Sequence, residues 1–550
     1  MNRMLKTEAG GEAAPLFHDG ERRVQERMGT RGIEAWARTA IRSRMPDQHR
    51  AFYAAQPFLI VSARDGKGRP WATVLEGKEG FVSSSKDTVL EIHGKPVSGD
   101  ALEGAFQPGA DAGILGIELA TRRRNRANGR VLETSGEGFA LGVDLAFGNC
   151  PQYIRARAFR RVRQAPAVAV SRGSALTASQ KTWIATADTF FIASGYRGTG
   201  EHPGFGMDVS HRGGARGVVE VLGDRRIRFP DFAGNKLYNT LGNILADPRA
   251  GFLFLDFSTG SLLQLTGRAE IERDPDELRK YPDAQQFVSL EIEEIVELTS
   301  ALRLRWQEEA ASARSLRLIE KKRENADVTS FVFEARDGGP LPEFKAGQHL
   351  PVELKLPGAG KKLLRTYSLS GPPADPRYRI SVKRLPDGAA SRLLHDALEP
   401  GAIVECQGPA GDFTLPEGED PLVLVSAGIG ITPLLAMLHQ LAGEGGSRPV
   451  WFVHGVRDGE HHPFREEVRR LVEGRAAIQA LTWYSGPLAS DVHGRDYDRP
   501  GRITVDALVA LTDPARAHYL LCGPAGFLAD MTSGLERRGV PESRIRSESF

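Results

Sequence analysis

An apolar run meets two close glycines in the stretch Pro421-Leu-Val-Leu-Val-Ser-Ala-Gly428-Ile-Gly430-Ile-Thr432-Pro433. The part from Leu422 to Val425 has no polar face, which is typical of a parallel strand covered on both sides. The glycines let a ligand approach the backbone, and Pro433 suits the first turn of a helix. Because the amides at a helix start attract phosphate, the pattern predicts a nucleotide site or, more simply, an ordinary strand–turn–helix connection.

The totals restrict the class of protein. A chain of 550 residues has room for three or four domains at roughly 150 residues each. The 72 basic and 70 acidic side chains nearly cancel, which gives no indication of a nucleic-acid or membrane partner. Three scattered cysteines cannot form a disulfide framework or a four-cysteine metal site, and we expect no metal. Without a signal peptide or a run of ~18 apolar residues, we expect a cytoplasmic protein.

The first half of the chain contains an internal repeat. After an N-terminal arm (1–45), short strands separated by turn signals predict a small barrel. Its strand that begins at Gly113 recurs at Gly251, and Gly129 recurs at Gly267, so both pairs lie 138 positions apart. We therefore expect two related β-barrels in tandem, at residues 46–165 and 175–310.

The second copy carries the richer polar set. Hydroxyl, guanidinium and amide groups around glycines can hold a phosphate or the polar edge of a flavin. In the first copy Glu76 stands near the matching place, and its negative charge opposes phosphate. The alternative is a structural barrel that uses these groups for turns. The candidate ligand residues are Ser210, Arg212, Arg216 and Asn235.

This region resembles the pyridoxamine 5′-phosphate oxidase-like split barrel, a family whose members commonly bind FMN between two chains of a dimer. The resemblance implies FMN in the second repeat, with two fused copies that imitate the dimer inside one chain, and it leaves oligomers through the split barrels open. The run Arg122-Arg-Arg-Asn-Arg126 lies between two repeat strands. We interpret it as a solvated hairpin rather than a phosphate site.

After residue 315, the residue types suit a dinucleotide flavin. A flat isoalloxazine needs an aromatic wall and polar partners at its edge, which Tyr367 and Ser368 can supply from one strand. A pyrophosphate needs a planar cation and helix-start amides, which Arg365 and residues 388–391 can supply. We expect an antiparallel barrel at 315–417 and an α/β lobe at 418–550.

These motifs resemble, in order and spacing, the ferredoxin–NADP reductase-like family, and most of all the reductase half of flavohaemoglobins. The resemblance implies a multidomain chain in which the two split barrels precede an antiparallel FAD-binding β-barrel and an α/β NAD(P)-binding lobe. It implies catalytic roles at the flavin ring for Cys522, Glu548 and Phe550. The implied cofactor-binding residues are Arg365, Thr366, Tyr367, Ser368, Val382, Lys383, Gly388, Ala389, Ala390, Ser391, Gly428, Ile429, Gly430, Ile431, Thr432, Gly523 and Pro524.

Two positions leave alternatives open. Many relatives carry Tyr where this chain has His349, so His349 is either a flavin contact or a histidine on the barrel surface. A 2′-phosphate favours a cation after the second strand of the lobe, where Arg457 supports NADPH and Asp458 opposes it.

The function predicted from these observations is that of an NAD(P)H-dependent flavin oxidoreductase. Electrons would pass from NAD(P)H to FAD, and then to barrel-bound FMN or a substrate, or to an external carrier such as a ferredoxin-type centre. Such a centre would belong to a longer natural chain or to a separate partner. The alternative is an FAD reductase whose split barrels form a binding and dimerisation module without a redox role.

Overall fold

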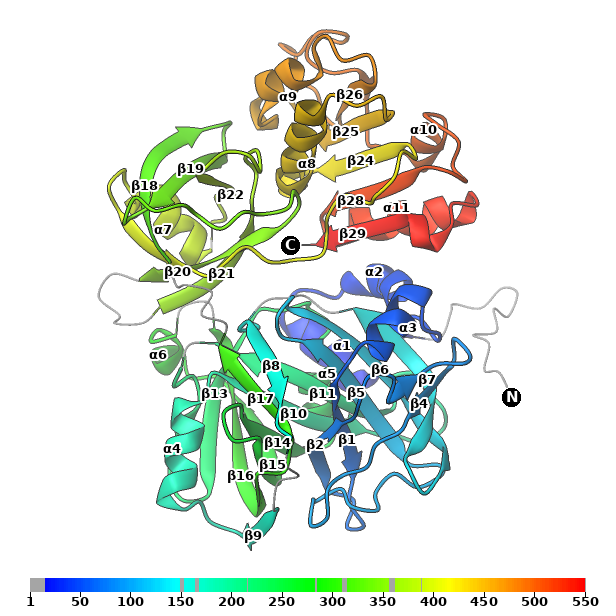
Figure 1. Ribbon diagram of the computed structural model, residues 1–550, viewed down its shortest axis with the longest axis vertical. Coiled ribbons are helices and arrows are strands. Elements are labelled where there is room, and N and C mark those ends of the chain that lie inside the picture. Colours follow the sequence, from blue (N-terminus) through cyan, green and yellow to red (C-terminus); the bar gives the residue numbers. More distant parts are fainter. Residues whose placement is uncertain are drawn as a thin grey trace.

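The chain divides into a repeat half and a C-terminal half, which Figure 1 shows one above the other. The computed structural model describes residues 15–148, 153–163, 168–214, 216–281, 284–308, 314–355, 362–386 and 388–549. Residues 15–308 form the repeat half and residues 314–549 the C-terminal half. No helix in this described part of the chain is both long and apolar enough to cross a membrane.

The repeat half consists mainly of two antiparallel sheets with the same strand order, as an internal repeat requires. The orders are β2-β1-β5-β6-β7-β4-β3 and β11-β10-β14-β15-β16-β13-β12, with β9 added to β16. The strands of the first sheet are β1 (Phe58–Arg64), β2 (Pro70–Glu76), β3 (Val82–Ser83), β4 (Val89–Ile92), β5 (Asp111–Glu118), β6 (Arg123–Thr134) and β7 (Phe139–Gly148). Those of the second are β9 (Ala169–Gly173), β10 (Thr189–Tyr196), β11 (Gly206–Gly213), β12 (Glu220–Val221), β13 (Arg226–Phe232), β14 (Arg249–Asp256), β15 (Ser261–Glu272) and β16 (Ala284–Thr299).

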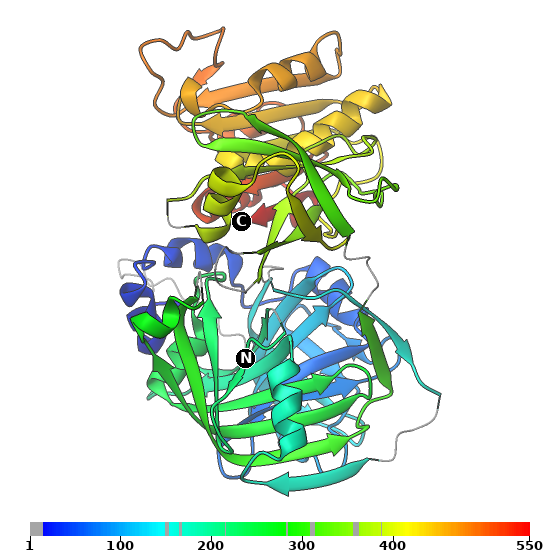
Figure 2. The ribbon, with the colours of Figure 1, turned by 90° about the vertical axis from the view of Figure 1, so that its left-hand side faces the viewer.

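The two sheets pack against each other with reciprocal contacts (Figure 2). A Cβ at Gly113 would lie 2.9 Å from Asp208 Cα on β11. A Cβ at the matching Gly251 would lie 2.7 Å from Trp71 Cα on β2. Because each copy places the equivalent glycine against the equivalent strand of the other, the two copies are related as in a twofold dimer.

Residues 15–45, the described part of the N-terminal arm, are mainly helical and contact both halves. Helix α1 (Asp19–Arg27) packs on α5 (Asn239–Ala246), and α2 (Ile33–Ala40) contacts α11 of the C-terminal half. Arg42 pairs with both Glu536 and Glu542, at 2.7 and 2.8 Å. The remaining elements of the repeat half are α3 (Asp47–Ala54), α4 (Ala178–Thr186), α6 (Pro275–Leu278) and the paired strands β8 (Arg157–Arg161) and β17 (Leu304–Glu308).

The C-terminal half begins with an antiparallel sheet in the order β21-β20-β23-β18-β19-β22. A bridge between Leu369 and Ile380 connects the ends of this order and closes the sheet into a barrel. The predicted antiparallel barrel is therefore confirmed. Its elements are β18 (Arg314–Arg323), β19 (Val328–Ala335), β20 (His349–Lys355), β21 (Lys362–Ser368), β22 (Tyr378–Lys383), α7 (Ala389–Ala397) and β23 (Ile403–Cys406).

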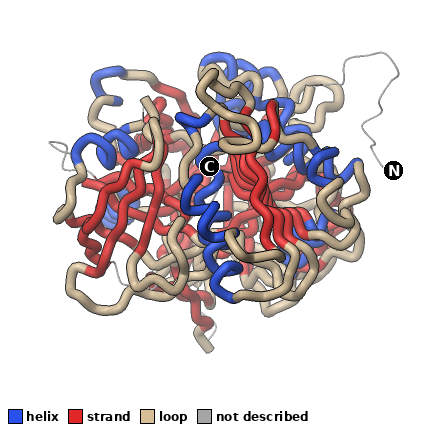
Figure 3. Tube along the Cα trace, turned by 90° about the horizontal axis from the view of Figure 1, so that it is seen from above, coloured by secondary structure: helices blue, strands red, loops and turns tan. Residues whose placement is uncertain are grey.

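The last part of the chain is the predicted α/β lobe, with a parallel sheet in the order β27-β26-β25-β24-β28-β29. Helices lie on both sides of this sheet in the view from above (Figure 3). The stretch 421–433 folds as expected: β24, buried from Leu422 to Ser426, leads through the turn η1 into a helix with Pro433 in its first turn. The elements are β24 (Leu422–Ala427), η1 (Gly428–Gly430), α8 (Ile431–Glu444), β25 (Val450–Val456), η2 (Gly459–His461), α9 (Arg465–Val472), β26 (Ile478–Tyr484), β27 (Arg499–Pro500), α10 (Val505–Val509), β28 (His518–Gly523), α11 (Ala525–Arg537), η3 (Glu542–Arg544) and β29 (Ile545–Ser549).

Candidate functional site

The carboxyl ends of β24, β28 and β29 bring the predicted nucleotide residues together. These strands are parallel neighbours, so residues Gly428–Gly430, Cys522 and Glu548 lie at one edge of the sheet. Gly428 has a φ of +57°, and a Cβ at Gly430 would clash with the carbonyl of Cys522. Only glycine permits this close approach of the turn to β28. Ile429, Ile431, Thr432, Gly523 and Pro524 complete the same edge.

Two titratable groups sit side by side at this edge. Cys522 is buried and pairs in register with Glu548. Burial raises the pKa of Glu548 to about 8, and the negative charge of Asp412 on the barrel adds to the effect. Burial and the nearby Glu548 also raise the pKa of Cys522 well above its usual range. Glu548 is therefore protonated, and Cys522 is a thiol, at neutral pH; the third predicted residue, Phe550, lies outside the described residues.

The barrel supplies a second set of predicted residues on β21 and at the start of α7. Arg365, Thr366 and Tyr367 are half-buried, and Ser368 is buried. The N-cap of α7 is Gly388, which has no side chain of its own to cap the helix. The Ser391 hydroxyl bonds to the turn that precedes α7: it accepts a hydrogen bond from Leu385 N and donates one to Gly388 O. Ala389 and Ala390 form the first turn, Val382 is buried on β22, and Lys383 pairs with Asp327 at 3.1 Å.

His349 is not on the barrel surface, so that alternative is wrong. Its side chain is 5% exposed, and its backbone pairs with Ser368 and Ala410. Burial and the nearby Arg122 lower the pKa of His349 to about 3, so the ring is neutral. The contact of this ring with a flavin stays a prediction.

The loop after β25 holds the two residues that were expected to decide between NADH and NADPH. Asp458 is buried, and its carboxylate accepts bonds from His461 N at 3.1 Å and His461 Nδ1 at 2.6 Å. Arg457 is two-thirds exposed and pairs with Asp458 at 3.0 Å. The Asp458 carboxylate is therefore paired within the loop, whereas the Arg457 side chain is exposed at the surface.

A second site lies between the two repeats. We call it the repeat pocket; it encloses about 820 Å³ of empty space, including its open mouth. Three of the four predicted ligand residues, Ser210, Arg212 and Asn235, line it. Arg216 does not, because its side chain is 66% exposed and points to Asp188, 3.9 Å away. Further lining residues include Arg124, Arg126, Tyr153, His211, Asp231, Phe232, Lys236, Tyr238 and Thr240.

The chemistry of the repeat pocket is that of a donor-rich cavity. Four cations line it against the single lining carboxylate of Asp231. Arg126 is buried and pairs with Asp208 at 2.8 Å and Ser210 at 2.6 Å. Within the described residues, the buried Nε atoms of Arg126 and Arg212 have no hydrogen-bond partner. Because unpaired buried donors are costly, the pocket favours a ligand rich in acceptor atoms, such as a phosphate.

His211 adds a third donor. The guanidinium of Arg124 lies 3.1 Å from His211 Nδ1 and can only donate, so Nδ1 accepts and the proton is on Nε2. Burial and three nearby arginines hold the pKa of His211 well below its usual range. The neutral ring therefore presents an Nε2–H group, which is buried and lacks a partner among the residues the structure describes.

The interpretation of Arg122–Arg126 as a solvated hairpin is wrong. Arg122 is 2% exposed and Arg126 is 6% exposed. Arg122 donates to Gln407 at 2.7 Å on the barrel, while Arg124 and Arg126 reach into the repeat pocket. The dense run of arginines was the available signal, but the hydrogen-bond and ion-pair partners of these side chains lie 82 to 289 positions away in the sequence.

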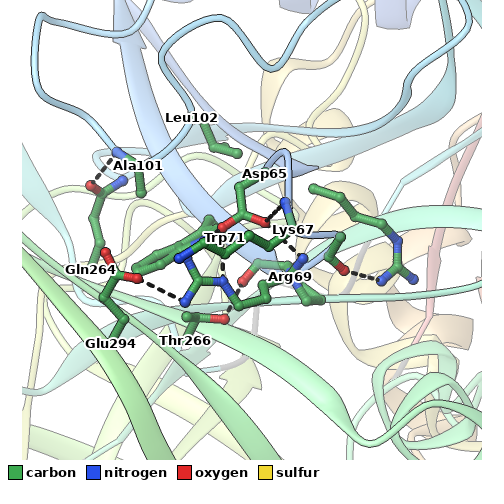
Figure 4. A network of polar contacts seen from close by, with 12 residues as sticks. Asp65, Lys67, Arg69, Trp71, Ala101, Leu102, Gln264, Thr266 and Glu294 are labelled. Carbon is green, nitrogen blue, oxygen red and sulfur yellow. Dashed lines mark hydrogen bonds and ion pairs between the residues drawn. The ribbon is translucent and has the colours of Figure 1, made fainter. Parts of the chain in front are cut away.

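The reciprocal packing creates a counterpart site on the other side of the repeat interface, which Figure 4 shows. We define it by Trp71, Asp100, Gln264 and Thr266. Gln264 donates to Ala72 O at 2.9 Å and to Asp100 at 3.1 Å, and Thr266 donates to Pro70 O at 2.8 Å. Trp71 is 1% exposed and donates to Asp65. This site is filled by its own side chains.

Comparison with known proteins assigns the C-terminal half. Residues 315–415 match the oxidoreductase FAD-binding domain, and residues 424–533 match the oxidoreductase NAD-binding domain. A flavohaemoprotein of Deinococcus radiodurans is 40% identical over 237 residues, which cover 43% of this chain and 59% of the relative. One of Chromobacterium violaceum is 39% identical over 244 residues, which cover 43% of this chain and 60% of the relative.

A solved structure is also similar to part of this chain. The flavohaem-like FAD/NAD-binding domain of a nitric oxide dioxygenase from Vibrio cholerae is 33% identical, covers 43% of this chain and 98% of that chain, and has a TM-score of 0.40. This chain spans about 60% of the length of the two flavohaemoproteins. The C-terminal half therefore contains an oxidoreductase FAD-binding domain at residues 315–415, followed by an oxidoreductase NAD-binding domain at residues 424–533.

Proposed function

We propose that the whole chain is an NAD(P)H-dependent flavin oxidoreductase. The observation that carries this is the meeting of Gly428–Gly430, Cys522 and Glu548 at one sheet edge, in a module whose barrel offers Arg365 and Tyr367. When bound, FAD accepts hydride from NAD(P)H and passes electrons onward. The residues of this chain bind and orient the two nucleotides.

The roles follow from the donors at each position. Arg365 and the amides of residues 388–391 would hold the FAD pyrophosphate, and Thr366 to Ser368 would face the ring, with Val382 and Lys383 beside it. Gly428–Thr432 would hold the NAD(P) phosphates. Gly523 and Pro524 would border the nicotinamide. Glu548 would hold a proton beside the ring below about pH 8, while the uncharged Cys522 and Phe550 would shape the ring site.

For the repeat half, we propose two split barrels of the pyridoxamine 5′-phosphate oxidase-like type, at 46–165 and 175–310, with FMN in the repeat pocket. The three unpaired buried donors and the aromatic residues Tyr153, Phe232 and Tyr238 support a ligand that has both a phosphate and a flat ring. FMN or a substrate held there would be one destination for electrons, and a ferredoxin-type carrier would be the other. The FAD-binding barrel would cover 315–417 and the NAD(P)-binding lobe 418–550.

The alternative function keeps the reductase and makes the repeat half a binding or dimerisation module without a redox role. The repeat interface has two equivalent sites, and one of them, the counterpart site, is filled by side chains. That site therefore favours the alternative without a redox role. Flavin extraction separates the two. We expect one FAD and one FMN per chain, whereas FAD alone would support the binding module.

An arginine variant tests the placement of FAD. Arg365→Ala should lose most bound FAD, while the circular dichroism of the chain stays unchanged. Arg377→Ala is the matched control, since Arg377 is an exposed barrel arginine that pairs with Asp375. Full retention of FAD by Arg365→Ala would contradict the proposed phosphate contact.

A further inference from the structure

Strained backbone gathers around the repeat pocket and its junction with the barrel. Non-glycine residues rarely adopt positive φ, and such residues mark sites where the surroundings enforce a costly conformation, ligand clamps among them. In the described part of the chain six residues do so. Four of them lie here, with φ between +60° and +66°: Arg122, Tyr153, Lys236 and Tyr238.

Tyr153 touches both the repeat pocket and the barrel. Its ring stacks on Phe232 of the pocket wall, with centroids 5.8 Å apart and planes inclined by 23°. Its hydroxyl donates to Ala233 O at 3.1 Å, just before the pocket residues 234–236. The guanidinium carbon of Arg365 also lies over the Tyr153 ring, 5.9 Å from its centroid. The same ring is therefore a wall of the pocket and a platform for the arginine that would hold FAD.

The start of β6 makes a second connection between the two sites. Arg122 donates to Gln407, and Arg123 lies 3.4 Å from Asp412, so both side chains contact the barrel. Arg124 and Arg126, which follow on the same strand, line the pocket. Figure 1 shows β20 and β21 on the side of the barrel that faces the repeat half. A ligand that fixes the pocket walls also fixes the surface on which the barrel rests.

We propose that the repeat pocket and the FAD site bind their ligands cooperatively, with Tyr153 as the positioning residue that the two sites share. This rests on the proposed function, because it requires FAD at Arg365 and a ligand in the pocket. A ligand that orders Phe232 and residues 234–236 holds the Tyr153 ring in place, and the ring in turn holds Arg365. Because the pocket ligand has already ordered the contact between Tyr153 and Arg365, FAD binding no longer includes the entropic cost of ordering it.

Titration calorimetry on the flavin-free full-length chain tests this, with FMN as the pocket probe. Saturating FMN should tighten FAD binding by about 3- to 10-fold, the range of a guanidinium–ring contact. FAD should tighten FMN binding by the same factor, because coupling is reciprocal. Tyr153→Ala should reduce the factor to about 1, and Tyr153→Phe, which keeps the ring, should retain most of it. The Arg212→Glu variant is the control for competition. Because its repeat pocket should no longer bind FMN well, any effect of FMN on its FAD affinity measures competition by FMN at the FAD site.

Each outcome decides a different point. If FMN binds the wild type in the repeat pocket and leaves FAD affinity unchanged, the cooperativity is wrong and the proposed function stands. An unchanged coupling factor in folded Tyr153→Ala overturns the role of Tyr153. If FMN does not bind, the proposed pocket ligand fails and the cooperativity fails with it. A factor above about 3 that Tyr153→Ala removes supports the proposal.

Discussion

The repeat pocket and its counterpart site are built from equivalent strands, yet their chemistry is opposite. Phe58 and Phe190 hold equivalent places, and in register they face Glu76 in the first copy and Arg212 in the second. By the same register, Trp71 corresponds to Met207. The second copy therefore has a cation where the first has a carboxylate, and a slender side chain where the first has an indole.

The difference shows how each site satisfies its polar groups. In the counterpart site, backbone carbonyls accept from Gln264 and Thr266. At the end of β2, the strand that carries Trp71, Glu76 accepts from the backbone N–H groups of Arg303 and Leu304. The repeat pocket instead leaves buried donors without partners in the described residues. Unmet donors cost stability unless a ligand pairs with them. We infer that the counterpart site contributes packing to the interface and that the repeat pocket contributes ligand binding.

Trp71→Ala tests the packing role and has the largest expected effect. Trp71 is fully buried and donates to Asp65 at 3.0 Å, so truncation should lower the free energy of unfolding by about 3–5 kcal/mol. Urea denaturation measures this change. The control is Trp71→Met, which introduces the residue of the equivalent position and leaves a smaller cavity, so it should cost less. A loss below about 1 kcal/mol in Trp71→Ala would show that the indole is not needed for packing.

Arg212→Glu gives the repeat pocket the charge of its counterpart. A negative charge beside Asp231 should repel phosphate, and we expect FMN to bind about 100-fold more weakly, which is about 2.7 kcal/mol. Fluorescence titration with FMN measures this. Glu76→Gln, at the matching position, should leave FMN affinity within about twofold. Equal losses in both variants would remove the distinction between the two sites.

Local patterns were enough to predict the elements whose cause lies within a short segment. The apolar run before Gly428 predicts a buried parallel strand, and the strand, turn and helix follow as expected. The acidic Glu76 against Arg212 also identified which copy carries the polar pocket. Both inferences depend on residue types at neighbouring positions, which the sequence displays directly.

Contacts between distant segments could not be predicted in this way. Arg126 is buried because Asp208, 82 positions away, pairs with it, and Arg122 is buried because the barrel covers it. Arg216 has the right residue type, but the chain turns it toward solvent. His211 and Tyr153 acquire their roles from Arg124 and Arg365, which lie on other strands.

His211→Phe removes a donor from the pocket and keeps a flat ring. If His211 Nε2–H donates to the ligand, FMN affinity should fall by about 10-fold, as for a hydrogen bond to a charged group. The wild type should show no histidine titration in FMN affinity between about pH 5.5 and 7.5, because the pKa of His211 lies well below its usual range. A step in affinity near pH 6.5 that His211→Phe abolishes would contradict the neutral donor.

Asp100→Asn changes the counterpart site toward the pocket and has the smallest expected effect. Asp100 accepts from Leu102 N at 2.8 Å, as Asn235 accepts from Leu237 N at 3.1 Å in the second copy, so asparagine fits this turn. Burial raises the pKa of Asp100 from its ordinary value of 3.8 to about 6, so the folded chain favours the protonated acid. Its contribution to stability is therefore full below about pH 4 and is lost as the pH rises to about 6.

The asparagine variant should remove this pH dependence. The pKa shift sets an upper limit of about 3 kcal/mol on the stability that the wild type loses as the pH rises. Relaxation around the buried carboxylate should reduce this loss to about 1 kcal/mol. Urea denaturation at pH 4, 5, 6 and 7 compares the two chains, with Asp47→Asn as an exposed control. The free energy of unfolding of Asp100→Asn, relative to that of the wild type, should increase as the pH rises. If this relative free energy of unfolding falls instead, Asp100 acts as a favourable buried anion. The counterpart site would then share a preference for charge with the pocket.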